Sequence, residues 1–190
     1  ATAGTVSIAI GDNAVASGET AQTAGQTAGY DPDGHNNTGN HGQAIAIGNN
    51  STAKGVQATA LGDDSHADNF GAVALGNNTW ATEWDTLALG SASHADGVRS
   101  TAIGTYAHSE GDNSTAIGLD SWANGSHSIV IGASQAAGTS DPNLMARADG
   151  NYSLAIGYSA KVYNATAGTN MDGSIAIGEK ASADDEGQLV

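Results

Sequence analysis

The sequence predicts an all-β fold in which short strands build a stack of 14-residue coils. A glycine follows an apolar pair at intervals of 14 residues over the whole stretch from Gly48 to Gly132. The residues on both sides of that glycine alternate with a period of two, which is the period of a β-strand. Each unit also contains one or two glycines, each costing ~1 kcal/mol inside a helix, so helix is disfavoured. A fixed period of this kind indicates a repeat architecture.

The repeat extends beyond the regular stretch. The seven evenly spaced glycines are Gly48, Gly62, Gly76, Gly90, Gly104, Gly118 and Gly132. Related units end at Gly11, Gly157 and Gly178, and a degenerate unit ends at Gly25. The wider gaps between these units predict three loop insertions, at about residues 26–44, 133–152 and 163–173, because insertions in repeat proteins project from the regular body.

Each unit is expected to hold two strands of four or five residues. Counted from the glycine as zero, position −1 is Ile or Leu, position −2 is alanine apart from Val130, and positions +3 and +5 are mostly Ala or Ser. The glycine and the Asp, Asn or Ser at +1 and +2 suit a turn with positive φ. Successive coils would stack as parallel strands at about 4.8 Å, which makes ten units a rod on the order of 50 Å long.

Two arrangements of the apolar side chains stay open. In the first, the Ile and Leu side chains fill the coil over the small residues, and the alanine face at −2 packs against another copy of the chain. In the second, alanine lies inside the coil, and the Ile and Leu side chains at −1 and −3 lie between subunits. Both predict that the coil associates with copies of itself.

Composition and charge restrict the function. The chain of 190 residues has 27 glycines, 5% aromatic residues and one phenylalanine, which fits a thin repeat better than a compact core. Its net charge of −15 argues against nucleic acid and anionic membranes as partners. Without cysteine it has neither a disulfide framework nor a thiolate metal site. No apolar run approaches the ~20 residues of a membrane-spanning helix.

Position +4 is the most informative variable position, because it lies between two small inward positions and so faces outward. The column reads Val15, Thr52, His66, Trp80, His94, His108, Trp122, Ala136, Lys161 and Ser182. The five consecutive His and Trp residues form a candidate ligand-binding stripe: His66, Trp80, His94, His108 and Trp122. A line of exposed aromatic side chains suggests an interaction site. The alternative is that these rings pack against a neighbouring subunit or an insertion.

No metal site, cofactor or catalytic centre is expected. A straight ladder of parallel histidines diverges, whereas a metal needs convergent ligands. Asp and Asn in the turns are ordinary turn residues. The sequence contains no set of nucleophile, base and orienting residue, so we expect that the protein is not an enzyme.

The repeats resemble those of trimeric autotransporter adhesins, and in particular the YadA-type head. The resemblance rests on units of the form S-V-A-I-G-x-x-S/A-x-A-x-G, which here are Ser7–Gly11, Ser100–Gly104, Ser114–Gly118, Ser153–Gly157 and Ser174–Gly178. It implies a left-handed parallel β-roll in a side-by-side homotrimer, displayed on the outer membrane of a Gram-negative bacterium. Residues 1–190 are then one head domain, and we expect the neck, coiled-coil stalk and membrane anchor to be absent from this fragment.

The resemblance also implies a function. An adhesin head mediates multivalent attachment to extracellular-matrix proteins such as collagen, fibronectin or laminin, to host-cell receptors or to other bacteria, and contributes to virulence. One alternative is a structural spike or spacer without a ligand of its own. Another is a hexapeptide-type acyltransferase, but that family needs an aliphatic residue every 6 positions and about 18 residues per coil, and the period here is 14. Ice binding would need a threonine array, which Ile, Leu and Val interrupt.

Overall fold

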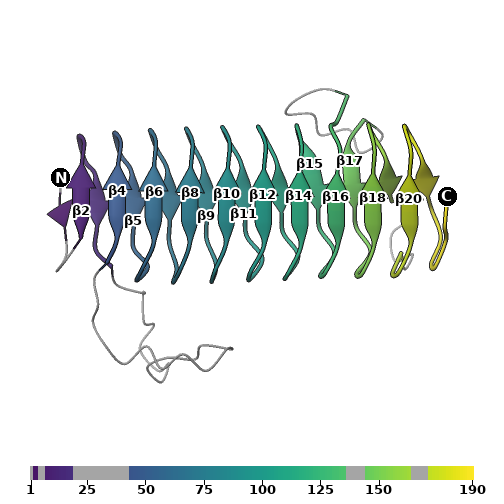
Figure 1. The fold of residues 1–190 in the computed structure, drawn as a ribbon, viewed down its shortest axis with the longest axis horizontal. Coiled ribbons are helices and arrows are strands. Elements are labelled where there is room, and N and C mark those ends of the chain that lie inside the picture. The colour runs from purple at the N-terminus through teal and green to yellow at the C-terminus, as the bar shows by residue number, and fades with distance from the viewer. Residues whose placement is uncertain (1, 4–6, 19–42, 136–143, 164–170) are drawn as a thin grey trace, which may run out of the picture.

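A computed structural model describes residues 2–3, 7–18, 43–135, 144–163 and 171–190. In these residues the protein is all-β, and its strands form two parallel sheets that face each other along a rod (Figure 1). No described segment forms a helix with the length and hydropathy that crossing a membrane requires. The two parallel sheets confirm the predicted β-roll of 14-residue coils.

The first sheet has ten strands. In spatial order they are β2 (Ile8–Ile10), β4 (Ile45–Ile47), β6 (Thr59–Leu61), β8 (Val73–Leu75), β10 (Leu87–Leu89), β12 (Thr101–Ile103), β14 (Thr115–Ile117), β16 (Ile129–Ile131), β18 (Leu154–Ile156) and β20 (Ile175–Ile177).

The second sheet has eleven strands. They are β1 (Thr2–Ala3), β3 (Val15–Ala16), β5 (Thr52–Ala53), β7 (His66–Ala67), β9 (Trp80–Ala81), β11 (His94–Ala95), β13 (His108–Ser109), β15 (Ser121–Ala123), β17 (Ala146–Ala148), β19 (Lys161–Val162) and β21 (Ser182–Ala183). All strands have two or three residues, fewer than the predicted four or five, because the turns at the two edges of each coil occupy the remaining positions.

The strands pair in register, one repeat apart. Leu87 pairs with Thr101, and Thr101 pairs with Thr115, so equivalent residues of successive coils lie side by side. The register also holds across the wider gaps, where Ile129 pairs with Leu154 and Leu154 with Ile175. Each position of the repeat therefore becomes a straight column along the rod.

Alanine fills the interior, which decides between the two arrangements that the sequence left open. From the unit of Gly48 onward, the side chains at position −2 have relative exposures of 0 to 1% and are Ala46, Ala60, Ala74, Ala88, Ala102, Ala116, Val130, Ala155 and Ala176. Ala9, in the first unit, is partly buried. The small residues at +3 and +5 are buried against them from the opposite sheet. The Ile and Leu side chains at −1 and −3 point outward, so the arrangement with an external alanine face is wrong. Alanine and serine line most of the space between the two sheets, and the largest fully buried side chains there are Val130 and Val162.

The glycine column is fixed by the contact between stacked coils. Gly104 has a φ of +135°, and a Cβ there would lie 2.3 Å from the carbonyl oxygen of Gly118. Gly62 and Gly90 have the same conformation and the same clash with the next glycine. At position +2, Asn50 and Asp64 have positive φ as predicted. The repeat thus requires glycine for two reasons, its φ and its lack of a side chain.

One of the three predicted insertions, at residues 133–152, contains a strand of the regular coil. The range 133–152 includes β17, which pairs with β15, so the coil resumes inside it. The backbone N–H of Gln135 donates to the carbonyl of Leu144 at 2.8 Å, which brings the two sides of residues 136–143 together. The degenerate unit predicted at Gly25 lies outside the described residues, and β2 pairs directly with β4.

Replacing a column glycine should destabilise the rod far more than replacing a turn glycine. We expect Gly104→Ala to lower the free energy of unfolding by about 3 kcal/mol or more, since it combines a forbidden φ with a backbone clash. Gly71→Ala is the control, because its φ of +64° is shared by Gln57 and Arg99 in the same column, and its Cβ meets only the Asp85 side chain. That change should cost about 1 kcal/mol. Urea unfolding followed by circular dichroism measures both, and equal losses would contradict the stacking explanation.

Candidate functional site

The five predicted site residues form one continuous stack of rings, which we call the ring ladder: His66, Trp80, His94, His108 and Trp122. They project from β7, β9, β11, β13 and β15, whose registers pair each ring with the next. The ring centroids are 4.0, 6.3, 4.8 and 4.0 Å apart in order along the rod, with interplanar angles of 6 to 18°. Parallel stacking follows directly from the parallel register, because equal side-chain directions at one-coil spacing place planar groups face to face.

Stacking leaves the rings only half-buried, with their edges toward solvent. The column was predicted to face outward, and it does, on the outer surface of the eleven-stranded sheet. The ring faces cover one another, so the surface offered to a partner consists mainly of ring edges. Contact of these five residues with a ligand stays a prediction.

Position +2 supplies hydrogen-bond acceptors for three of the five rings. Trp122 Nε1 donates to Asp120 Oδ1 at 2.7 Å, and Trp80 Nε1 donates to Asn78 Oδ1 at 3.3 Å. His66 Nε2 lies 3.2 Å from Asp64 Oδ1. This hydrogen bond, followed by one from Asn50, lowers the pKa of the Asp64 carboxyl. The acceptors fix the orientation of the rings within the stack.

The residue that follows Trp122 in the column is Arg147, and not Ala136 as predicted. Ala136 lies four residues after Gly132 in the sequence, but the strand that pairs with β15 is β17, in which Arg147 lies beside Trp122. Ala136 itself lies outside the described residues. Arg147 makes a double hydrogen bond to Asp149 and lies 4.5 Å from the ring centroid of Tyr163. The error arose because a count through an insertion loses the register.

Two further ring pairs escaped the sequence analysis. Phe70 and Trp84 lie at one turn edge with ring centroids 5.8 Å apart and a tilt of 33°. His127 stacks on Tyr152 at 4.8 Å. Phe70 and Trp84 share position +8, and His127 and Tyr152 share the next position of the repeat. Listing the residues at +8, as was done for +4, would have found Phe70 and Trp84. For Tyr152, the repeat count again passes through an insertion.

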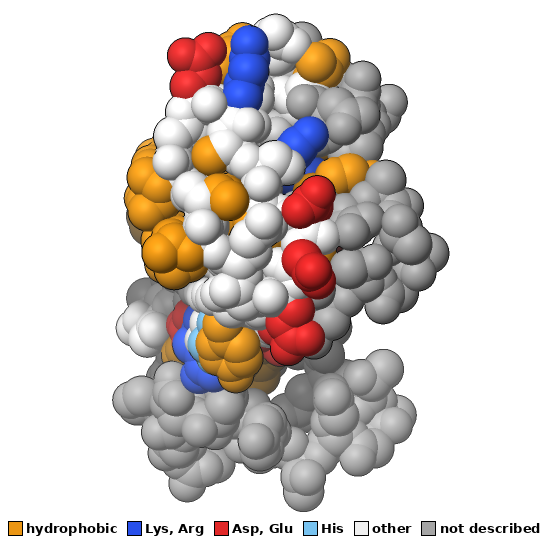
Figure 2. Space-filling view, turned by 90° about the vertical axis from the view of Figure 1, so that its right-hand side faces the viewer, with side chains coloured by type: hydrophobic (Ala, Val, Ile, Leu, Met, Phe, Trp, Pro, Cys, Tyr) orange, Lys and Arg blue, Asp and Glu red, His pale blue; other side chains and the backbone are white. Residues whose placement is uncertain are grey.

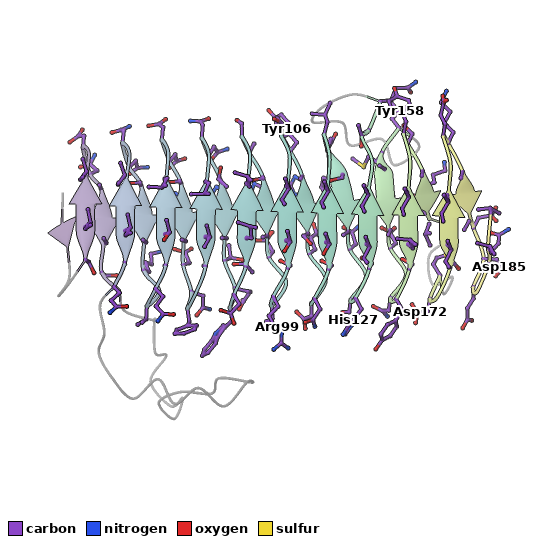
Figure 3. All side chains as sticks on the ribbon, in the orientation of Figure 1. Arg99, Tyr106, His127, Tyr158, Asp172 and Asp185 are labelled. Atoms are coloured by element: carbon purple, nitrogen blue, oxygen red, sulfur yellow. The ribbon has the colours of Figure 1, made fainter. Side chains whose placement is uncertain are left out.

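The two turn edges of the rod carry different side chains. Tyr106 and Tyr158 project from one edge, and Arg99, His127 and Asp172 from the other (Figure 3). At the N-terminal end of the Tyr106 edge, Asn and Asp alternate from coil to coil: Asp63 accepts hydrogen bonds from the side chains of Asn49 and Asn77.

If every coil carried an Asp at this position, neighbouring carboxylates would repel one another. Alternation with Asn avoids that repulsion, because the neutral amides of Asn49 and Asn77 donate hydrogen bonds to the Asp63 carboxylate.

The described residues include no group of three or more His, Asp or Glu side chains placed to hold a metal ion. The ring ladder presents half-buried aromatic rings in a straight line, and hydrogen bonds to position +2 orient three of them.

Comparison with protein-family models matches the chain to the YadA head domain repeat, in its two-copy form. The matches span residues 4–21, 42–65, 85–107, 109–134, 145–162 and 170–187, which together are more than half of the chain. None of the curated proteins compared with the chain matches it.

Acidification should destabilise the ladder through His108. Burial lowers the pKa of His108 to about 4 from its ordinary 6.5, with a further decrease from His94 and opposing increases from Asp120 and Asp96. Between these two pH values the unfolded chain binds a proton that the folded chain does not, so the stability is complete above pH 6.5 and falls as the pH falls toward 4. We expect the melting temperature to drop more between pH 7 and pH 4.5 in the wild type than in His108→Phe, which keeps a stacked ring.

The raised pKa values of Glu83 and Glu110 act in the opposite direction, because these carboxyls bind protons more readily when folded. The wild type and His108→Phe both contain Glu83 and Glu110, so the difference between their pH profiles isolates the effect of His108. Identical profiles would contradict a buried, neutral imidazole.

Proposed function

Because the chain belongs to the YadA head repeat family, we propose that it is the head of a trimeric autotransporter adhesin on the outer membrane of a Gram-negative bacterium. The family is one of surface-exposed adhesin domains. In our proposal, three copies lie side by side, and their outward sheets attach to host extracellular matrix, host cells or other bacteria. The observation that carries the proposal is the difference between the two outer faces of the rod.

The ten-stranded sheet has an apolar outer face, which we call the aliphatic face. Its most exposed members, with relative exposures of 36 to 57%, are Ile8, Ile10, Ile47, Leu61, Leu89, Ile129, Ile131 and Ile177. Viewed from the C-terminal end, a group of hydrophobic side chains lies on one flank, and several acidic side chains lie toward the opposite flank (Figure 2). A monomer rarely exposes an apolar surface along its whole length. Members of the family form trimers, so we infer that a second and a third copy of the chain cover the aliphatic face.

The eleven-stranded sheet carries the ring ladder on its outer face. If the aliphatic faces meet at the centre of a trimer, this sheet faces outward in all three subunits. Three copies of one surface then bind together, and the effective concentration raises a weak single contact to strong attachment. The half-buried state of the rings supports one alternative, in which the ladder only stiffens a spacer and has no ligand.

Charge on the aliphatic face should abolish assembly. Leu89→Asp places a carboxylate in the proposed interface, where burying an unpaired charge is unfavourable, so we expect a monomer in analytical ultracentrifugation. Thr52→Asp is the matched control on the opposite sheet and should leave the trimer intact. Loss of assembly in both variants, or in neither, would contradict the assignment of the interface.

Attachment should depend on assembly and on the ring ladder separately. On plates coated with matrix proteins, we expect the Leu89→Asp monomer to bind about 10²-fold more weakly than the trimer. Trp80→Ala and Trp122→Ala should weaken attachment while the trimer persists. Equal binding by monomer and trimer would reject multivalency. Lost assembly with unchanged binding in the Trp variants would assign the rings to packing instead.

A further inference from the structure

Four carboxylates of the outer sheet and its turn edge form no ion pair with another described residue. We call them the acidic strip: Glu83, Asp96, Glu110 and Asp112. Asp96 and Glu110 follow the ladder rings by two residues, and Glu83 and Asp112 lie in the turns beside them. They lie close enough to interact, because Asp112 and Asp96 both act on the ionisation of Glu83, and Asp96 acts on that of Glu110.

Ion pairs bound the strip at both ends. Lys54 lies 2.8 Å from Asp68 on the N-terminal side, and Arg147 lies 2.7 Å from Asp149 on the C-terminal side. Between them, within the described part of the chain, none of the four strip carboxylates forms an ion pair. Asp96 accepts a hydrogen bond from Thr82 at 2.8 Å, and Asp112 accepts one from the backbone of Val98 at 3.0 Å. These donors are neutral, and Arg147 and His94 only partly offset the increase that burial and Asp96 cause in the pKa of Glu110. The negative charge of the strip is therefore only partly compensated.

Apolar columns lie on both sides of Glu83, Asp96 and Glu110. The ring ladder lies on one side, at position +4. On the other side, at +8, four consecutive coils carry an apolar edge column: Val56, Phe70, Trp84 and Val98. Phe70 and Trp84 are tilted relative to each other and half-buried, so they are not stacked face on face as the ladder rings are. The acidic strip is therefore a negatively charged track beside the ring ladder, and it reaches the edge column at Asp112, which follows Val98 at position +8. Val56 of that column is buried, so Phe70, Trp84 and Val98 are its accessible apolar members.

This combination suits one kind of side chain. Lys and Arg have an apolar stem that packs along hydrophobic surface and a charged head that seeks a carboxylate. A cation near the face of a tryptophan or phenylalanine gains a further attraction. Burial, followed by the repulsion between neighbouring carboxylates, raises the pKa of Glu83 and of Glu110, and a bound cation would relieve that repulsion.

We propose that the acidic strip and the apolar edge column beside it bind a polypeptide segment that carries several Lys or Arg side chains and lies along the rod. The proposal rests on the proposed attachment function and names the chemistry of a partner for the outer sheet. The columns run parallel to the rod axis, so a segment of extended backbone can meet the carboxylates of successive coils. Nucleic acids and anionic lipid surfaces carry the wrong charge for this track.

A labelled ten-residue peptide of alternating Lys and Ser tests the proposal by fluorescence anisotropy, with a Glu-Ser peptide of equal length as the negative control. We expect the assembled wild-type protein to bind only the Lys peptide. The double variant Glu83→Gln/Glu110→Gln should bind it at least tenfold more weakly. The matched control Glu179→Gln/Glu186→Gln removes the same charge from exposed sites on the last coils and should change the affinity less than twofold. Trp84→Ala should weaken binding severalfold.

Three results would overturn the proposal. Equal weakening in the two double variants would mean general attraction to a chain of net charge −15. Equal binding of the two peptides would exclude charge recognition. A changed sedimentation coefficient for Trp84→Ala would assign the edge column to contacts between copies.

The attachment assay separates this proposal from the proposed function. A trimer that attaches to matrix but does not distinguish the peptides rejects the strip alone. Selective peptide binding with equal attachment of monomer and trimer rejects multivalent attachment alone.

Discussion

The parallel backbone pairing of successive coils is the constraint on which the rest of the structure depends. Each strand residue lies in register beside the equivalent residue of the next repeat, so every position of the repeat forms a column along the rod. The pairing holds only if the coils approach closely at every turn, and the clash that a Cβ at Gly62 or Gly90 would make shows how close that approach is. Every surface property of the protein follows from what each column contains.

The same constraint explains why neighbouring columns use opposite chemistry. A column places identical positions about 4.8 Å apart, which favours stacked rings and disfavours stacked charges. Asp63, bracketed by Asn49 and Asn77, has its charge balanced by neutral donors. For Glu83 and Glu110, burial and then the charges of neighbouring carboxylates raise the pKa. The carboxylates of the acidic strip form no ion pair with another described residue, and this is the reason to look for a partner there.

The sequence predicted the repeat and its columns well, because glycine spacing and period-two alternation are set by the backbone. It could not decide whether Ala102 or Ile103 lies inside, since both are apolar and the choice depends on the distance between two sheets. It predicted the members of the ring ladder but not their mutual stacking, which needs the in-register pairing. Arg147 was missed because residues 136–143 interrupt the count, and Phe70 and Trp84 because only one variable column was read.

Hydroxyl-radical footprinting of the assembled protein tests most directly which face is enclosed and which is presented. The account predicts that Leu61, Leu89 and Ile131 are protected from oxidation in the assembly relative to a monomeric variant, whereas Trp80 and Trp122 react equally in both. Protection of the tryptophans with reactive Leu61 and Leu89 would contradict the account, because it would place the ring ladder, and not the aliphatic face, between the subunits.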